Sequence, residues 1–414
     1  MWDDEFLIAS PLLPIFLIVA VDVLGLTIMI PLLPFYAESL GASPAGVGWL
    51  VGVYAACQLI SGPILGRMSD SMGRKPLLIV SQIGTCIGFI ITAFAPNLWI
   101  LFFARGVDGI TAGNLTLAQA YISDVTKPEE RAKSFGIIGI AFGLGFLIGP
   151  AISGFLAQFD YRWPIFAAAA LSAASITTTS LLLPSVKPSG DGSGPAGRRP
   201  QFFDLSAYSK YFGKPALAGK LWAFLLFSLP FAMFTTGLPL FAERRLTWNG
   251  EPFGPEQLGY VWAFVGFLGI IWQGPSLGRL VKRFGEVPLN RTGFVAYALG
   301  YTIFAFTYSI PVLLVGAAIA SVGSFVRPTL TSLITHSAPR EEQGAVLGLT
   351  QSLSSISLII GPLIAGYLIE HELLTAWGLL AAILALGGLF FALRMSTSDT
   401  TDASPAIETT TARQ

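Results

Sequence analysis

The stretch GPILGRMSDSMGRKP, residues 62–76, lies between two long apolar runs, and it carries four charged side chains within nine residues. A similar stretch, GPSLGRLVKRFGE, occurs at residues 274–286. Charged loops between apolar runs are typical of a chain that crosses a bilayer repeatedly. The pair of stretches therefore predicts a membrane protein with two related halves. The charged residues of the first stretch are Arg67, Asp70, Arg74 and Lys75.

The composition supports a membrane protein and argues against several other classes. The chain of 414 residues is 53% hydrophobic and 12% charged, with a mean hydropathy of +0.68, whereas soluble domains carry roughly 25% charged residues. The net charge is zero, so we expect no nucleic-acid partner. Two cysteines and two histidines provide neither a disulfide framework nor a metal site, and no catalytic motif is present. We expect no enzyme, no metal and no cofactor.

Twelve apolar segments are long enough to be membrane-spanning helices, which need about 20 residues each. The acidic start MWDDEF lacks the basic residues of a signal peptide, so we expect an uncleaved first span. The predicted fold class is an all-α membrane protein with twelve transmembrane helices in two pseudo-symmetric six-helix bundles. The predicted spans are residues 11–36, 46–66, 76–95, 98–124, 134–158, 162–184, 218–242, 256–278, 287–308, 310–336, 343–369 and 373–394.

The distribution of lysine and arginine predicts the orientation. With both termini inside, the even-numbered loops and the C-terminal tail hold nineteen of these residues, and the outer loops hold three. This predicts a multi-pass protein of the plasma (cytoplasmic) membrane with cytoplasmic termini. We expect an N-terminal bundle at 1–184, a cytoplasmic linker at 185–217, a C-terminal bundle at 218–394 and a disordered tail at 395–414.

A constant offset of 212 residues relates matching residues in three separate places. This indicates a duplicated six-helix unit, and parallel halves of this kind enclose a midplane cavity and rock about it. Asp70 is replaced by Lys282 in the second copy. The matched pairs are Gly62–Gly274, Pro63–Pro275, Leu65–Leu277, Gly66–Gly278, Arg67–Arg279, Gly73–Gly285, Glu129–Glu341, Glu130–Glu342, Gly136–Gly348, Gly149–Gly361 and Pro150–Pro362.

Four further stretches, together with GRMSDSMGRKP, carry a resemblance to a known family. They are DVLGLTIMIPLLP at 22–34, RGVDGITAGN at 105–114, AYISDVTKPEERAKSFG at 120–136 and GFLIGPAISG at 145–154. The chain resembles the major facilitator superfamily, and more narrowly its drug:proton antiporters, which include tetracycline and multidrug efflux proteins. The resemblance implies proton-coupled export of small amphiphilic or drug-like molecules by alternating access. We expect a monomer in the lipid bilayer.

Two other functions remain open on the sequence. One is a proton-coupled symporter or facilitator that imports a small nutrient, and the other is a membrane scaffold or sensor that does not transport. The stretch at 145–154 argues against the importer, because it resembles a motif associated with antiporters. Charges within the spans argue against the scaffold. The relatives that expel tetracycline carry an acid in the third span where this chain has Gly88, which argues against tetracycline itself.

The resemblance also implies a gate in the loop between spans two and three. Asp70 is expected to contact the start of the eleventh span in one state, and a charge cluster is expected to hold in one state and break in the other. The alternative is ordinary anchoring of the loop by its basic residues. The residues assigned to this latch are Gly66, Asp70, Gly73, Arg74 and Asp124.

Three charged residues lie within predicted spans at nearly the same depth: Asp22 in the first span, and Arg105 and Asp108 one turn apart in the fourth. Each costs about 2.5–3.5 kcal/mol to insert, so we expect a partner or a transport role. Our hypothesis is that Asp22 takes and releases the driving proton, influenced by Arg105, with Asp108 as a second candidate. The alternative is a static ion pair between spans one and four. Arg327 either reaches toward the interface or faces anions in the cavity.

The remaining candidates are the antiporter-like motif and a set of polar and aromatic side chains. Gly145, Gly149, Pro150 and Gly154 are expected to bend the fifth span and restrict leak, or alternatively only to allow close packing. An aromatic cavity with few charges suits amphiphilic or cationic molecules. Some cavity candidates could instead make interhelical hydrogen bonds or face lipid. The cavity candidates are Tyr54, Gln58, Asn114, Gln119, Trp262, Gln273 and Gln351.

Overall fold

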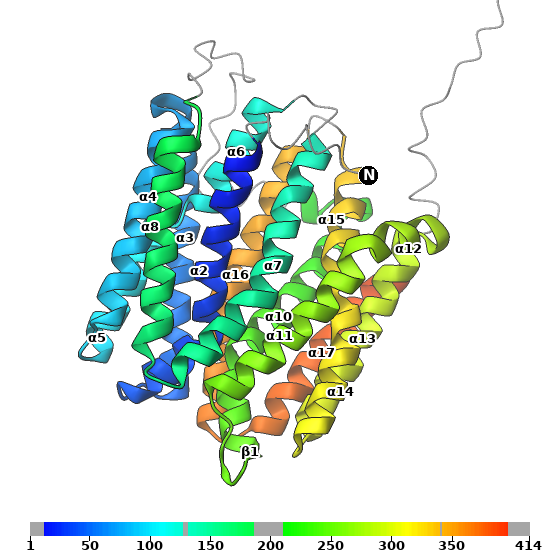
Figure 1. The fold of residues 1–414 in the computed structure, drawn as a ribbon. Coiled ribbons are helices and arrows are strands. Elements are labelled where there is room, and N and C mark those ends of the chain that lie inside the picture. Colours follow the sequence, from blue (N-terminus) through cyan, green and yellow to red (C-terminus); the bar gives the residue numbers. More distant parts are fainter. Residues whose placement is uncertain (1–11, 127–130, 186–209, 340–341, 396–414) are drawn as a thin grey trace, which may run out of the picture.

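The computed structural model describes residues 12–126, 131–185, 210–339 and 342–395. Within these residues the chain is almost entirely helical, with one two-stranded hairpin of β1 (Thr247–Trp248) and β2 (Glu251–Pro252). The helices pack side by side in a single bundle (Figure 1). The prediction of an all-α membrane protein is confirmed.

Six spans precede residue 186. The first three are single helices, and the fourth is divided into two by a break at Ala112 and Gly113. The spans are α2 (Leu12–Ser39), α3 (Pro44–Met72), α4 (Arg74–Ala93), α5 (Leu98–Thr111) with α6 (Asn114–Val125), α7 (Arg131–Ala157) and α8 (Arg162–Leu182).

Six further spans follow residue 209, and two of them are interrupted. A π-helical segment, Trp272–Ser276, divides the eighth span, and a 3₁₀ segment, Val322–Phe325, divides the tenth. The spans are α10 (Pro215–Arg245), α11 (Pro255–Ile271) with α12 (Leu277–Phe284), α13 (Glu286–Phe306), α14 (Ile310–Ser321) with α15 (Val326–His336), α16 (Gln343–Glu370) and α17 (Leu374–Leu393).

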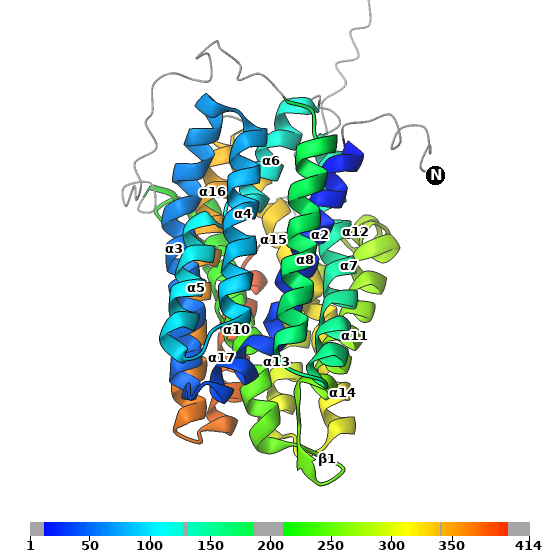
Figure 2. The ribbon, with the colours of Figure 1, turned by 60° about the vertical axis from the view of Figure 1, so that its left-hand side comes forward.

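The helices follow the twelve predicted spans in order within the described residues. By length and composition alone, nine of these spans are long and apolar enough to cross a membrane. The other three predicted spans, 98–124, 256–278 and 287–308, are also helical, but the first two are interrupted. Odd-numbered spans run away from the end at which α2 begins and α17 ends, which we call the terminal face. The opposite end carries the β1–β2 hairpin and is called the far face (Figures 1 and 2).

The hydrophobic core is shared by both halves toward the far face and divided toward the terminal face. The largest cluster joins residues of both halves, including Leu50 and Trp377. Toward the terminal face one cluster contains only residues between Ile15 and Leu183, and another only residues between Tyr211 and Met395. The core is therefore forked: one cluster joins both halves at the far face, and it divides into one cluster for each half toward the terminal face.

Glycines allow the halves to touch at the far face. A side chain at Gly48 of α3 would collide with the carbonyl of Pro362 on α16, and one at Gly259 of α11 would collide with Pro150 on α7. The Ser43 hydroxyl donates to Glu370 across the same boundary, at 2.9 Å. Toward the terminal face, a Cβ at Gly62 would have no described atom within 4 Å. The two halves therefore separate along α3.

The breaks in the fourth and tenth spans lie at positions related by the internal repeat. The offset of 212 places Ala112 on Ser324, so both breaks lie at equivalent positions. Ser81 of α4 replaces the lost helical bonds in the first break, because its hydroxyl accepts from the Gly113 N–H at 2.9 Å and donates to the Thr111 carbonyl. Interrupted helices at matching places are typical of binding sites between transporter repeats.

Most of the predicted linker at 185–217 falls on residues 186–209, outside the described residues, as does the tail after residue 395. The end of the predicted linker differs from the expectation. Tyr211 and Leu217 are buried in the C-terminal half, and Lys210 and Lys214 bind Glu342 at 2.8 and 2.7 Å. Hydrogen bonds from these two lysines lower the pKa of Glu342 to about 2. The second half therefore begins before residue 218, because apolar and basic side chains attach residues 210–217 to it.

We expect Gly48→Ala to destabilise the protein more than Gly62→Ala, since only the first substitution forces a methyl group into backbone of the other half. Overpacking of this kind costs about 1–3 kcal/mol, or roughly 2–5 °C in the unfolding midpoint. Thermal unfolding of both purified variants in detergent measures the difference. Equal midpoints for the two variants would contradict the close contact between α3 and α16.

Candidate functional site

A buried ion pair occupies the middle of the fourth span. Arg105 Nη1 donates to Asp108 Oδ2 at 2.7 Å, and the two residues are 6% and 5% exposed. The guanidinium also lies over the Tyr54 ring of α3, 4.2 Å from its centroid. The Nε atom of Arg105 has no hydrogen-bond partner among the described residues. The two formal charges therefore cancel, and the pair lies on α5 against α3.

Glycines on α4 and on α5 itself bring the helices close together around this pair. A Cβ at Gly88 of α4 would lie 2.8 Å from the Asp108 Cβ, and one at Gly109 would lie 2.7 Å from the Cys57 Cβ on α3. A side chain at residue 88 would therefore collide with the Cβ of residue 108, whichever side chain stands there. This gives a physical reason for the glycine at the position where the family resemblance leads one to expect an acid.

Asp22 lies in a different polar cluster, between α2, α4 and α8. Its carboxyl group interacts with Ser175 of α8 and Gln82 of α4, and Gln82 Nε2 donates to Ser175 Oγ at 2.7 Å. Gln82 is fully buried, and its Oε1 has no partner among the described residues. Arg105 binds Asp108 and not Asp22, so the structure does not show the ion pair between spans one and four that was considered on the sequence.

The latch residues meet at the terminal face. Arg74 binds Asp70 at 2.6 Å and Asp124 at 2.8 Å, so the predicted charge cluster forms. Gly73 connects α3 to α4 with a φ of 93°, which favours glycine, and its N–H donates to the Ser69 carbonyl at 3.0 Å. Among the described residues the ion-pair partner of Asp70 is Arg74 and not a residue of α16. This agrees with halves that are apart at the terminal face.

The antiporter-like motif forms the contacts of the fifth span with both of its neighbours. Gly145 and Gly149 lie against Val23 and Thr27 of α2, and the Thr27 hydroxyl donates to the Gly145 carbonyl at 2.9 Å. Pro150 and Gly154 face α11, where a Cβ at Gly154 would lie 2.9 Å from the Glu256 carbonyl. Close packing accounts for these four residues. Their role in restricting leak stays a prediction.

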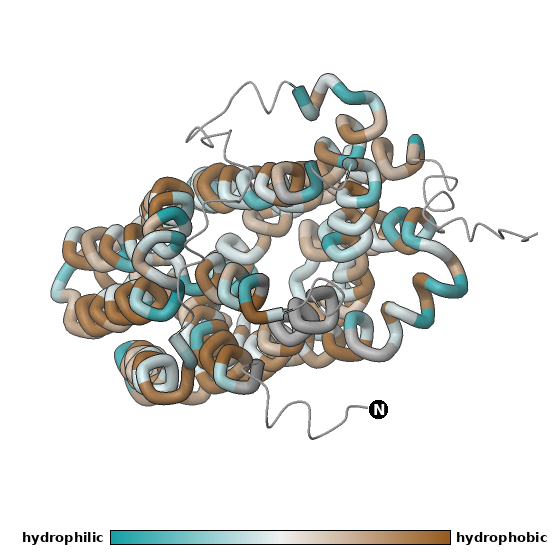
Figure 3. The backbone as a smooth tube through the Cα atoms, turned by 90° about the horizontal axis from the view of Figure 1, so that it is seen from above, coloured by the Kyte–Doolittle hydropathy of each residue, from teal (hydrophilic) through white to brown (hydrophobic). Residues whose placement is uncertain are grey.

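Six of the seven cavity candidates are exposed or half-buried, and the seventh, Trp262, is buried. Gln119, Gln273 and Gln351 are exposed although they lie within spans, and Tyr54, Gln58 and Asn114 are half-buried. Gln58 donates to the Tyr54 hydroxyl at 3.3 Å. Figure 3 shows the helices of both halves end-on from the terminal face. Trp262 does not belong with the others, because it is 4% exposed and packs edge-on against Phe234 in the shared core.

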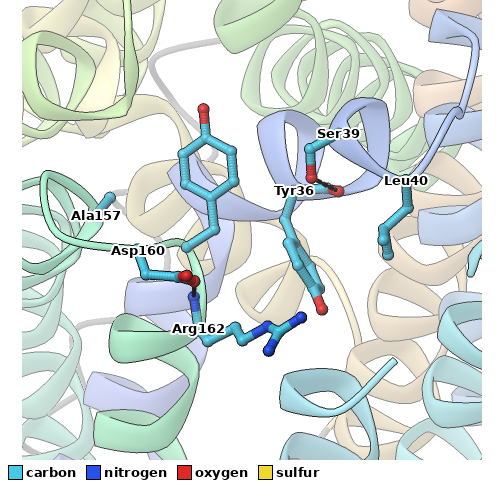
Figure 4. Close-up of a pocket in the computed structure, with 7 residues that line it drawn as sticks. Tyr36, Ser39, Leu40, Ala157, Asp160 and Arg162 are labelled. Carbon is cyan, nitrogen blue, oxygen red and sulfur yellow. Dashed lines mark hydrogen bonds between the residues drawn. The ribbon is translucent and has the colours of Figure 1, made fainter. Parts of the chain in front are cut away.

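A pocket of about 490 Å³ opens at the far face, away from these residues (Figure 4). Tyr36 donates to the Thr92 carbonyl at 2.9 Å, and Asp160 accepts from the Arg162 N–H at 2.7 Å. None of the site residues chosen from the sequence lines this pocket. The lining residues are Tyr36, Ser39, Leu40, Ala157, Asp160, Tyr161 and Arg162.

Sequence reasoning did not find Gln82 and Ser175, the two polar partners of Asp22. Both are uncharged and lie in apolar helices, where a single polar residue is a weak signal. It also missed the far-face ion pair of Arg244 with Glu38, which joins α10 to α2 at 2.5 Å. The available signal was that two of the three arginines in the outer loops, Arg244 and Arg245, stand together.

Comparisons with known proteins agree with this architecture. The family model described as Major Facilitator Superfamily matches residues 15–292 and 273–411. The chain is 31% identical to the class C tetracycline resistance protein of Escherichia coli, over 84% of this chain and 86% of that protein. It is 32% identical to the class G tetracycline resistance protein of Vibrio anguillarum, over 84% and 87%. The crystal structure of the nucleoside transporter NupG has a TM-score of 0.75, with 14% identity over 93% and 98%.

We expect Asp108→Asn to lower the free energy of unfolding by about 3–5 kcal/mol, because it leaves the Arg105 charge buried without a carboxylate. Asp124→Asn is the matched control, since it breaks an Arg–Asp pair that is partly exposed and costs at most about 1 kcal/mol. Chemical or thermal unfolding in detergent measures both.

The double variant Arg105→Gln with Asp108→Asn should recover part of the stability lost in Asp108→Asn, since neither charge then remains. A cost for Asp108→Asn no greater than that for Asp124→Asn would show that the buried pair is not formed.

Proposed function

Because the chain belongs to the major facilitator superfamily, we propose that it exports small amphiphilic or drug-like molecules across the plasma membrane in exchange for protons. As a member of this family it is a multi-pass membrane transport protein and not an enzyme. The relatives at 31% and 32% identity are named for resistance to tetracycline, which supports drug export. Gly88 stands where the family resemblance leads one to expect an acid, and a side chain there would collide with the Asp108 Cβ, so we propose a class of amphiphiles and not tetracycline itself.

The forked core supports alternating access. In this conformation the halves are joined at the far face and separated at the terminal face, so the space between them opens toward the terminal face. The excess of lysine and arginine in loops at that face supports our proposal that it faces the cytoplasm. The proposed cycle takes substrate from the cytoplasmic side, closes the terminal face and opens the far face.

We assign the coupling proton to Asp22, and one observation carries this choice. Asp108 is neutralised by Arg105, whereas the carboxyl group of Asp22 lies among uncharged partners and forms no ion pair among the described residues. An unpaired carboxylate inside a membrane is costly, and protonation removes that cost. A neutral Asp22 carboxyl group also carries a hydrogen-bond donor, and the buried Gln82 Oε1 in the same cluster is an acceptor without a partner.

Coupling then follows from the position of Asp22 on α2. This helix packs along α7, whose other face contacts the second half through α11. A movement of the halves therefore changes the surroundings of Asp22 and the water that reaches it. The carboxyl group can bind a proton when the far face is open and release it when the terminal face is open.

The test is transport by Asp22→Asn in proteoliposomes. We expect pH-gradient-driven accumulation of norfloxacin, a fluorescent amphiphile, to fall at least about tenfold, while exchange of norfloxacin down its own gradient persists. The reason is that asparagine keeps the polar contacts but cannot carry the proton. Asp160→Asn, at the far face, is the control and should behave like the wild type.

Two results would count against the proposal. Full gradient-driven accumulation by Asp22→Asn would remove Asp22 from the proton path. Absence of any proton-dependent movement of norfloxacin and similar amphiphiles by the wild-type protein would overturn export by proton exchange.

A further inference from the structure

Arg327 lies near the middle of the tenth span, on the second residue of α15 after the 3₁₀ segment. It is nine residues from His336, which places it about 14 Å inside the terminal end of the helix. The hydrocarbon core is about 30 Å thick, so this depth is close to the midplane. An arginine at this depth needs a protein partner, water or a ligand.

The surroundings of Arg327 indicate that it lines a water-filled space. Ser324, in the 3₁₀ segment, and Arg327, Thr331 and Thr335 of α15 are polar, exposed or half-buried, and follow a helical spacing. The other positions of α15 that are not buried are Pro328, Ser332 and His336. The opposite side is apolar and buried in the C-terminal half, with Val326, Leu330, Leu333 and Ile334. A polar stripe faces water in a bundle interior and not lipid.

The packing of α15 also indicates that Arg327 faces a water-filled space. Its helical neighbours are α10, α13 and α16, all in the C-terminal half, so its polar stripe is turned away from that half. Arg327 keeps solvent-exposed surface although it lies deep within the bundle. A residue that is exposed at this depth and turned away from its own half lies in the space between the halves.

Arg327 differs from the other midplane arginine in having no acid beside it. Arg105 binds Asp108, whereas no carboxylate pairs with Arg327 among the described residues. The group that interacts with it electrostatically is the phenol of Tyr297 on α13. Ser324 Oγ, on the preceding turn, is buried without a partner. The positive charge of this wall of the cavity is therefore not balanced by the protein itself.

Aromatic rings border the same region. Tyr297 stacks on Tyr301 with ring centroids 5.5 Å apart, and it contacts Phe227 of α10 at 5.8 Å. Trp272, in the π-helical segment, meets Phe325 at 5.7 Å and donates to Ser321 at 3.0 Å. A cation next to flat apolar surfaces matches a molecule with an oxyanion attached to an aromatic body.

We propose that Arg327 is the anion-binding group of the substrate cavity, and that the exported amphiphiles carry a carboxylate or similar oxyanion on an aromatic body. This rests on the proposed function for the direction of transport, but binding itself can be measured without transport. The guanidinium offers paired N–H donors that fit the two oxygens of a carboxylate. Arg105, already bound to Asp108, does not compete for the anion.

The test uses two probes of nearly the same size and shape, the anionic naphthalene-1-acetate and the neutral naphthalene-1-acetamide. Equilibrium dialysis or titration calorimetry with the full-length protein in detergent gives their dissociation constants. We expect the acetate to bind at least about tenfold more tightly to the wild type, as a charge-assisted hydrogen bond provides. Arg327→Gln should remove this preference and leave acetamide binding unchanged, which also shows that the variant is folded.

Two further variants separate charge from structure. Arg327→Lys should keep a reduced preference for the acetate, because it retains the charge but not the paired donors. Arg283→Gln, an exposed position on α12, removes the same charge from the same half and should keep the full preference.

The outcomes distinguish this inference from the proposed function. Equal binding of both probes to the wild type, no saturable binding of the acetate, or an unchanged preference in Arg327→Gln would overturn the anion site. A clear preference that depends on Arg327, in a protein that moves neither norfloxacin nor the acetate with protons, would overturn the proposed export and leave the anion site standing.

Discussion

The close contact of the two halves at the far face is the constraint on which the rest of the structure depends. Glycines on α3, α11 and α16 bring backbone against backbone, and each contact leaves no room for a side chain. Since the same helices separate toward the terminal face, the core is divided there into two clusters, one for each half. A bundle joined at only one end can open at that end without losing the core of either half.

This geometry places the charged side chains at the depth where the core divides. Arg105 and Asp108 cancel each other within one helix, so they add polarity but little net charge to the N-terminal half. Asp22 and Arg327 are the midspan charges without an opposite charge among the described residues, and they belong to different halves. In the proposed mechanism Asp22 exchanges a proton while Arg327 holds the anionic group of the substrate. The proposed proton site and the proposed anion site thus belong to different halves.

The length of the apolar segments was enough to predict the twelve spans, and the offset of 212 was enough to predict the two halves. The latch of Arg74 with Asp70 and Asp124 followed from the family resemblance. The sequence placed Arg105 and Asp108 one turn apart on one helix, but it paired Arg105 with Asp22, and the structure pairs it with Asp108. The partners of Asp22 could not be predicted in this way, because they come from α4 and α8, and sequence spacing does not determine which faces of separate helices meet. Trp262 was misplaced for the same reason, since the sequence shows an aromatic residue in a span but not the direction it faces.

The central claim is that the far-face contact must open in every transport cycle. The most direct measurement is a reversible cross-link across it, with Ser43→Cys and Glu370→Cys introduced into a chain in which Cys57 and Cys86 are replaced by serine. In the closed state the Ser43 hydroxyl donates to the Glu370 carboxylate at 2.9 Å, so the two helix ends are adjacent. Cysteine side chains are shorter than glutamate, so a bis-maleimide linker with a cleavable disulfide is used to join them. The account predicts that this cross-link stops transport of norfloxacin in proteoliposomes and that a reducing agent, which cleaves the linker, restores it. Undiminished transport by the fully cross-linked protein would contradict it.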